Sequence, residues 1–167
     1  MKYLTILMLF MSTSIYSQEV KDINFIIEID EEIVISAKLD LFITSKDGNR
    51  KGVNFVSGYC PGKLLLKDSD YKELLSDSTQ RIILEITYYD FNIKKEDDME
   101  IYSYEIEAEK FWFDVNYLSF FILKIYNLDK RKYRKRFDPL SKDQNYTFEY
   151  STSSGNMLRF KTGTYQK

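Results

Sequence analysis

Alternation of apolar and polar side chains with a period of two dominates this chain and predicts β-strands. The longest such run covers residues 32–44, and similar runs cover residues 81–88 and 102–109. Successive side chains of a strand point to opposite faces of a sheet, so each run should turn one face toward a core. We expect eight apolar side chains, from these runs and from the apolar run at 117–126, to be buried: Ile35, Leu39, Leu41, Leu84, Ile86, Ile106, Leu123 and Ile125.

Weaker patterns complete the list of elements. Residues 117–126 are apolar on both faces, which is typical of a central strand covered on each side. Shorter strands are expected at 24–29, 53–56, 63–66, 132–137, 146–151 and 157–161. Turn-forming residues lie at 30–31, 47–49 and 154–156. Only residues 71–76 indicate a helix, with Asp70 as its N-cap and Glu73 three positions later.

About ten strands and one short helix predict an all-β fold. Antiparallel strands joined by short turns favour a two-sheet sandwich. A closed β-barrel is the alternative, because a number of strands does not determine whether a sheet closes. No linker or repeat divides residues 18–167, so we expect a single all-β domain there.

The first seventeen residues indicate export. Lys2, an apolar run from 3 to 11 and small residues up to Ser17 match the zones of a secretory signal peptide, with cleavage expected between Ser17 and Gln18. The apolar run is shorter than the roughly 20 residues that a membrane span needs. We therefore expect an exported protein without a transmembrane segment, in the periplasm, on the cell surface or in the medium.

The composition excludes several chemistries. The chain has no histidine and one cysteine, so a serine triad, a cysteine–histidine pair and histidine-based metal sites are ruled out. A net charge of −2 argues against nucleic-acid binding. No metal or cofactor site is predicted. Cys60 cannot close an internal disulfide; we expect a half-buried apolar side chain, with an intermolecular disulfide or a reactive thiol as alternatives.

Carboxylate chemistry and serine–lysine chemistry remain open to an enzyme, and the carboxylates offer the better candidate group. Glu105, Glu107 and Glu109 would share one face of a strand at steps of roughly 6–7 Å, a spacing that could suit a glycosidase pair. A hydrolase would need Glu105, Glu107 or Asp97 and Asp98 to line a concave pocket. Alternating Glu is also what a solvent-exposed sheet face shows, and we prefer that interpretation. Asp68 and Asp70, with Glu73, lack the spacing and glycine of an EF-hand calcium loop, which leaves helix capping as the better explanation.

The most unusual segment, 130–137, combines six basic residues with two aromatic ones: Lys130, Arg131, Lys132, Tyr133, Arg134, Lys135, Arg136 and Phe137. As a strand it would turn Tyr133 and Phe137 inward and form a charged edge that blocks further pairing. Contact with an anionic envelope component is a second interpretation, and docking on an acidic protein is a third. A complementary acidic segment spans residues 96–109, and the two segments could neutralise each other or lie apart.

Aromatic residues supply a second candidate contact. Phe111, Trp112 and Phe113 are adjacent, and on an extended chain they cannot all enter one core. At least one should be exposed or packed on a second face, where it could stack on a sugar ring or cap a protein partner.

These observations favour a non-enzymatic binding or structural module of a bacterial envelope or secreted assembly. The bacterial source is suggested by an AT-rich type of composition, rich in Lys, Ile, Asn and Tyr. The alternatives are the carboxylate-based hydrolase and a β-barrel carrier of an apolar ligand. The shape of the molecule would distinguish the three functions. A flat sandwich favours the binding module, a polar cleft with converging acids favours the hydrolase, and an apolar internal cavity favours the carrier.

Overall fold

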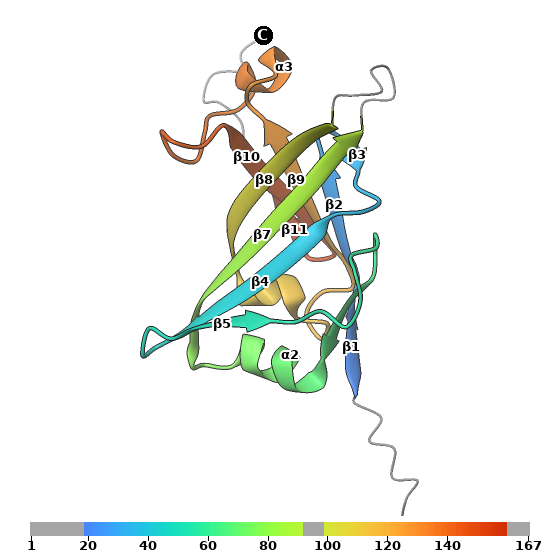
Figure 1. The fold of residues 1–167 in the computed structure, drawn as a ribbon, viewed down its shortest axis with the longest axis vertical. Coiled ribbons are helices and arrows are strands. Elements are labelled where there is room, and N and C mark those ends of the chain that lie inside the picture. The colour runs from blue at the N-terminus through green and yellow to red at the C-terminus, as the bar shows by residue number, and fades with distance from the viewer. Residues whose placement is uncertain (1–18, 92–98, 160–167) are drawn as a thin grey trace, which may run out of the picture.

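Two β-sheets face each other in the computed structural model, which describes residues 19–91 and 99–159 (Figure 1). The fold is the predicted all-β sandwich. The expected signal peptide and the acidic pair Asp97 and Asp98 lie outside the described residues. Within them, no helix has the length and hydropathy needed to cross a membrane.

The larger sheet has the order β11–β10–β9–β2–β3, and its strands are β2 (Phe25–Ile29), β3 (Glu32–Ile33), β9 (Phe121–Asn127), β10 (Tyr146–Thr152) and β11 (Gly155–Met157). The smaller sheet has the order β5–β4–β7–β8, with β4 (Lys38–Ser45), β5 (Arg50–Val53), β7 (Thr79–Phe91) and β8 (Met99–Ala108). A separate ribbon joins β1 (Val20–Ile23) to β6 (Leu64–Lys67). In the described part of the chain both large sheets end in edge strands, so the closed-barrel alternative does not apply.

One pairing departs from the expected antiparallel pattern. β2 and β9 run parallel at the centre of the larger sheet, with Phe25 opposite Phe121 and Ile29 opposite Ile125. Parallel neighbours need a long connection, and here it contains the whole smaller sheet.

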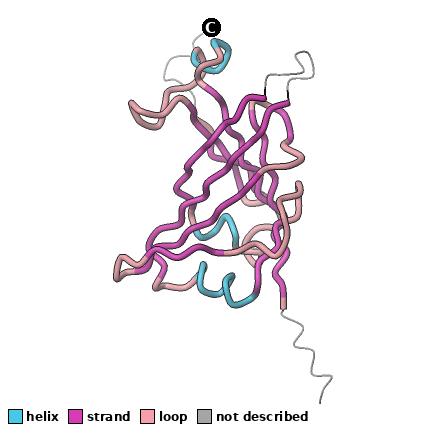
Figure 2. The backbone as a smooth tube through the Cα atoms, viewed as in Figure 1, coloured by secondary structure: helices cyan, strands magenta, loops and turns pink. Residues whose placement is uncertain are grey.

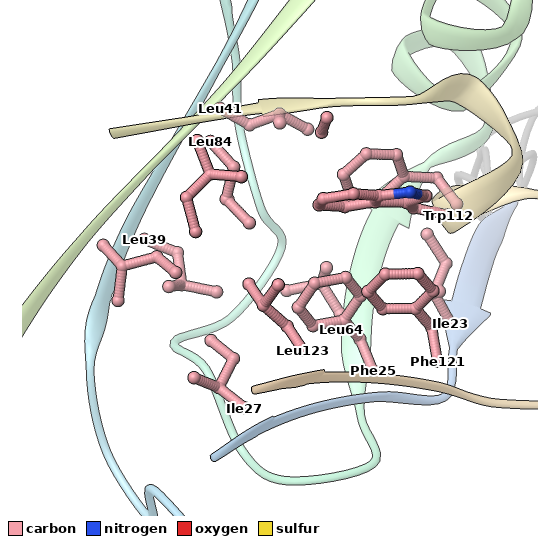
Figure 3. Packing of buried hydrophobic residues seen from close by; sticks show 14 of the residues in the cluster. Ile23, Phe25, Ile27, Leu39, Leu41, Leu64, Leu84, Trp112, Phe121 and Leu123 are labelled. Carbon is pink, nitrogen blue, oxygen red and sulfur yellow. The ribbon is translucent and has the colours of Figure 1, made fainter. Parts of the chain in front are cut away.

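The core fills the space between the sheets. Figure 3 shows Leu39, Leu41 and Leu84 of the smaller sheet facing Ile27 and Leu123 of the larger one. Seven of the eight apolar side chains expected to be buried are so: Leu39, Leu41, Leu84, Ile86, Ile106, Leu123 and Ile125. At about 25 cal/mol per Å² of apolar surface removed from water, this contact is the main favourable contribution to folding.

The eighth, Ile35, was predicted wrongly, because it is 80% exposed. The expected strand at 32–44 is interrupted: β3 ends at Ile33, and the chain crosses to the other sheet before β4 begins at Lys38. The Val34 N–H donates to the Ile27 carbonyl at 2.9 Å, and the Val34 side chain is buried. The inward positions therefore change register across the crossing.

Smaller boundary errors have local causes. β9 begins at Phe121 instead of residue 117, and a turn at 115–117 leaves Tyr117 60% exposed. β5 covers Arg50–Val53 instead of 53–56, and β11 ends at Met157, before the expected 157–161. Such ends depend on hydrogen-bond partners that local pattern does not specify.

The helix α2 (Asp68–Leu75) starts earlier than predicted. Its N-cap is Lys67 without a side-chain cap bond, so Asp70 is not the cap. Asp68 and Asp70 instead occupy the first turn, where carboxylates interact favourably with the helix dipole. Figure 2 places α2 and the 3-10 helix η1 (Lys110–Phe113) toward the opposite end of the molecule from α3 (Arg131–Arg134).

Cys60 lies in a turn and is exposed with a free thiol, so the expectation of a half-buried side chain was wrong. Its carbonyl accepts a 2.9 Å hydrogen bond from Lys63 N–H. The neighbouring Tyr59 is the buried member of this turn, and its hydroxyl accepts the N–H of Ile27 at 2.7 Å. Burial raises the pKa of Tyr59 to about 12.

The Tyr146 side chain caps the outer edge of β8, an edge strand of the smaller sheet. The Tyr146 hydroxyl accepts the Glu105 N–H at 3.0 Å and donates to the Glu105 carbonyl at 2.5 Å. One phenol thus satisfies two outward backbone groups of an edge strand, groups that would otherwise be open to pairing with another chain.

Candidate functional site

The basic segment 130–137 is helical, and its prediction as an edge strand was wrong. α3 spans Arg131–Arg134, and helical hydrogen bonds continue past it, with the Phe137 N–H donating to the Tyr133 carbonyl at 2.9 Å. Lys and Arg are good helix formers, and the segment contains no glycine or proline. Tyr133 and Phe137 are four positions apart, a spacing that shares a face in both a strand and a helix, so the pattern was ambiguous.

Two aromatic side chains anchor α3 to the outer face of the larger sheet. Tyr133 and Phe137 are 2% and 1% exposed. Their rings pack on Tyr126 of β9, with centroids 5.1 and 4.5 Å away. Together with Leu128 they form a second buried cluster, separate from the main core. The inward orientation expected of these two side chains is therefore confirmed, although the element is different.

An acidic turn between β2 and β3 holds the segment from the side. Asp30 and Glu31 both have positive φ, at 56° and 73°. The Asp30 carboxylate accepts hydrogen bonds from Asn127 N–H at 2.8 Å and from Asn127 Nδ2 at 2.7 Å, and it pairs with Lys130 Nζ at 2.7 Å. These contacts fix the start of the basic segment to the end of β9.

Glu31 binds two further cations of the segment. Lys132 donates to one carboxylate oxygen and Arg136 pairs with the other at 3.1 Å. The hydrogen bond from Lys132, followed by the charges of both cations, lowers the pKa of Glu31 below its ordinary value. The same hydrogen bond raises the pKa of Lys132. Both shifts mean that the ion pair favours the charged forms.

The six cations therefore fall into two sets. Lys130, Lys132 and Arg136 are paired with the acidic turn. Arg131, Arg134 and Lys135 are exposed, and no ion-pair partner for them occurs among the described residues. Their spacing of three and four positions places them on one side of a helical segment. We call this set the outer triad. α3 lies at one end of the molecule (Figure 1), where the triad is open to solvent.

The aromatic segment 111–113 is a 3-10 helix instead of an extended chain. Trp112 and Phe113 are buried at 2% and 0% exposure and offer no surface contact. Phe111 is half-buried and is the one member that reaches the surface, where it packs against Tyr117 and Tyr150. Sequence reasoning missed these two tyrosines, because the turn that brings Tyr117 to Phe111 was assigned to a strand.

The acidic residues 105–109 do not converge on one cleft. Glu105 lies with Glu85 at a hollow of about 510 Å³, where Arg50 pairs with Glu85 at 2.8 Å. Glu107 and Glu109 line a different hollow of about 690 Å³, and Glu107 pairs with Arg81 at 3.1 Å. All three expected glutamates are exposed, as a solvated sheet face predicts.

The carboxylates near α2 are held by lysines. Asp68 pairs with Lys72 at 2.6 Å and with Lys21 at 3.6 Å, and Glu73 pairs with Lys51. Over residues 19–91 and 99–159, no group of three or more His, Cys, Asp or Glu side chains is placed to hold a metal ion.

The acidic segment 96–109 was expected either to neutralise the basic segment or to lie apart from it. Among the described residues, the carboxylates that pair with the basic segment belong to the turn at 30–31, about a hundred positions before α3. Two adjacent acids in a tight turn are a weak signal. Their long-range charge complementarity to the cluster of Lys and Arg is the feature that could have identified them.

No protein family model, curated protein or solved structure matches this chain. Its function is therefore inferred from the arrangement of these side chains.

Proposed function

We propose that this chain is an exported, non-enzymatic binding module that docks on an anionic component of a bacterial envelope through the outer triad, Arg131, Arg134 and Lys135. The single observation that carries the proposal is the division of the basic segment. Three of its cations are used internally by Asp30 and Glu31, and three face solvent without partners among the described residues.

The anchoring of α3 supports this assignment. Tyr133 and Phe137 are buried, so the helix is held against the sheet while the triad projects outward. Cations fixed on a packed element lose less freedom on binding than cations on a loose tail. Lipid phosphate is the partner that we favour, because each Lys or Arg near an anionic membrane surface contributes about 1 kcal/mol.

Export is part of the same proposal. The zones of residues 1–17 support it, since they match those of a secretory signal peptide and would bring the domain to the outer side of the membrane. The absence of histidine and the dispersal of the carboxylates between two hollows support a binding role in preference to hydrolysis.

Vesicle co-sedimentation tests the docking. The protein should bind phosphatidylglycerol vesicles and not phosphatidylcholine vesicles, and salt should weaken the binding because exposed charges are screened beyond roughly 10 Å at 0.1 M. Changing Arg131, Arg134 and Lys135 together to Ser should lower the affinity roughly 100-fold, from about 1 kcal/mol for each cation. Lys132 and Arg136 are left intact because they hold Glu31.

A charge-matched control separates the triad from bulk charge. Lys46, Lys63 and Lys67 lie elsewhere in the fold and have no ion-pair partner among the described residues. Their triple change to Ser removes the same charge and should leave binding nearly unchanged. Equal losses in both triple variants, or no binding of the parent protein to phosphatidylglycerol, would refute the proposal; capture of an acidic protein instead would favour the protein-partner interpretation.

A further inference from the structure

A hollow of about 230 Å³ lies at the end of the larger sheet opposite α3. β9 pairs Phe121 with Thr152 at this end and Asn127 with Tyr146 at the other, where α3 follows. The hollow is lined by three aromatic rings, Phe111, Tyr117 and Tyr150, and by the β10–β11 hairpin. It is therefore a surface separate from the outer triad.

The aromatic wall combines buried and open rings. Phe111 packs edge-on against Tyr117, with centroids 6.2 Å apart, and against Tyr150 at 5.8 Å. Tyr150 in turn contacts the buried Trp112 at 5.5 Å. Tyr117 is 60% exposed while its neighbours are packed. The wall is thus held by the core on one side and open to solvent on the other.

The hairpin wall is polar and is closed by its own hydrogen bonds. The Thr152 hydroxyl accepts the N–H groups of Ser154 and Gly155 at 3.1 and 3.0 Å and donates to the Gly155 carbonyl at 2.8 Å. The side chains of Ser154 and Asn156 and the hydroxyl of Tyr117 form no hydrogen bond within the part of the chain that is described. Donors and acceptors are therefore free beside the aromatic rings.

The lack of charged residues in the lining limits the class of ligand that the hollow can bind. Every residue that lines the hollow is uncharged. An anionic ligand would lose its hydration there without gaining a cation, which is costly. A ligand with several hydroxyl groups and one apolar face would instead meet both walls, since small-molecule sites pair apolar surface with a few placed polar groups.

We propose that this hollow binds a single neutral pyranose ring, with the C–H face of the sugar against Tyr117 and its hydroxyls bonded by Ser154 and Asn156. The electron-rich face of an aromatic ring attracts the weakly positive C–H edges of such a ring. The volume of about 230 Å³ is below the roughly 300–1,000 Å³ of sites for larger ligands, and it suits one sugar unit.

Methyl β-D-glucopyranoside is the probe, because its equatorial substituents leave flat C–H faces. Titration into isotope-labelled protein should give saturable NMR shifts at Tyr117 and residues 152–156. Saturation transfer from the protein should be strongest at the ring protons of one sugar face. Sorbitol, which carries similar hydroxyls without a ring, should give neither effect.

Two exposed tyrosines provide a matched pair of variants. Tyr117→Ala should weaken binding about 10-fold through loss of the stacking contact. Tyr89→Ala, at a tyrosine 38% exposed on the smaller sheet, should change it less than about 2-fold. Asn156→Ala should also weaken binding, and it tests the hydrogen-bonding wall without altering the aromatic one.

Three results would overturn the proposal: no saturable shift with the glucoside, equal shifts with sorbitol, or equal weakening by Tyr117→Ala and Tyr89→Ala. The outer triad does not enter this experiment. Loss of vesicle binding in the triad variant with sugar binding retained would show that the two sites are independent, and failure of one leaves the other standing.

Discussion

Individual side chains show how burial alone separates residues of similar chemistry. Leu84 and Leu123 are both 0% exposed on facing sheets, whereas Ile35 is 80% exposed between β3 and β4. All three lie in apolar patterns of the sequence, so the pattern does not distinguish them.

Truncation of these side chains should reveal the difference. Leu84→Ala and Leu123→Ala should each lower the free energy of unfolding by about 2–5 kcal/mol, since each leaves a cavity in the core. Ile35→Ala should change it by about 0.5 kcal/mol or less. Urea denaturation measures all three. A large loss at Ile35, or none at the two leucines, would contradict the placement of the core.

The ion pair of Glu31 should respond to acid. The hydrogen bond from Lys132 and the charge of Arg136 lower the pKa of Glu31 in the folded state. The ion pair therefore stabilises the fold fully at pH values above 4.5, the ordinary pKa of this carboxyl group. That contribution is lost as the pH falls through the lowered folded-state pKa. An NMR titration of the Glu31 carboxyl should give a midpoint below 4.5.

Lys132→Met should move this midpoint upward because it removes the first cause of the shift. Lys46→Met removes the same charge from the β4–β5 turn and should leave the midpoint in place. A midpoint that is unchanged in Lys132→Met would mean that the ion pair does not form in solution.

At the scale of elements, the structure shows where period-based prediction fails. Alternation located β4, β7 and β8 because each of these strands has one face in the core and one in water. It could not separate β3 from β4. The alternation of apolar residues continues through the crossing between the sheets, but the positions that point inward shift by one residue there. It also assigned α3 to a strand, because the buried side chains Tyr133 and Phe137 are four positions apart and would share one face in a strand as well as in a helix.

The candidate site was predictable only in part. The basic residues were evident in the sequence, but their division into paired and free sets depends on the turn at 30–31, which approaches α3 only in the folded chain. The aromatic hollow depends on a turn before β9 that local propensity did not indicate. Both are tertiary effects that override local pattern.

The capped edge of β8 permits a test at this scale. Tyr146→Phe removes the hydroxyl that satisfies both backbone groups of Glu105, so it should cost about 0.5–1.5 kcal/mol and increase self-association at high concentration. Tyr150→Phe is the matched control, because the Tyr150 hydroxyl has no hydrogen bond within the described residues. Light scattering and urea denaturation that fail to separate the two variants would show that the cap has no protective role.

At the scale of the whole molecule, the proposed export would determine in which compartment binding takes place. Mass spectrometry of the native protein should find Gln18 at the amino terminus, cyclised or not, because the zones of residues 1–17 resemble a cleaved signal peptide. Abundant protein that retains Met1 would remove the export part of the proposed function. The vesicle and sugar experiments would still stand.

The parallel pairing of β2 with β9 also sets an order of events during folding. Phe121 N–H donates to the Asn24 carbonyl at 2.8 Å, and Asn127 N–H reaches Asp30 across 97 positions. Closing so long a loop costs entropy before any contact compensates it, so such pairs form after local hairpins such as β7–β8. As the ribosome releases the chain, β2 is among the first strands to emerge. Its parallel partner β9 is complete only after Asn127 has been synthesised. The apolar side of β2 therefore depends on the late-synthesised part of the chain for its cover.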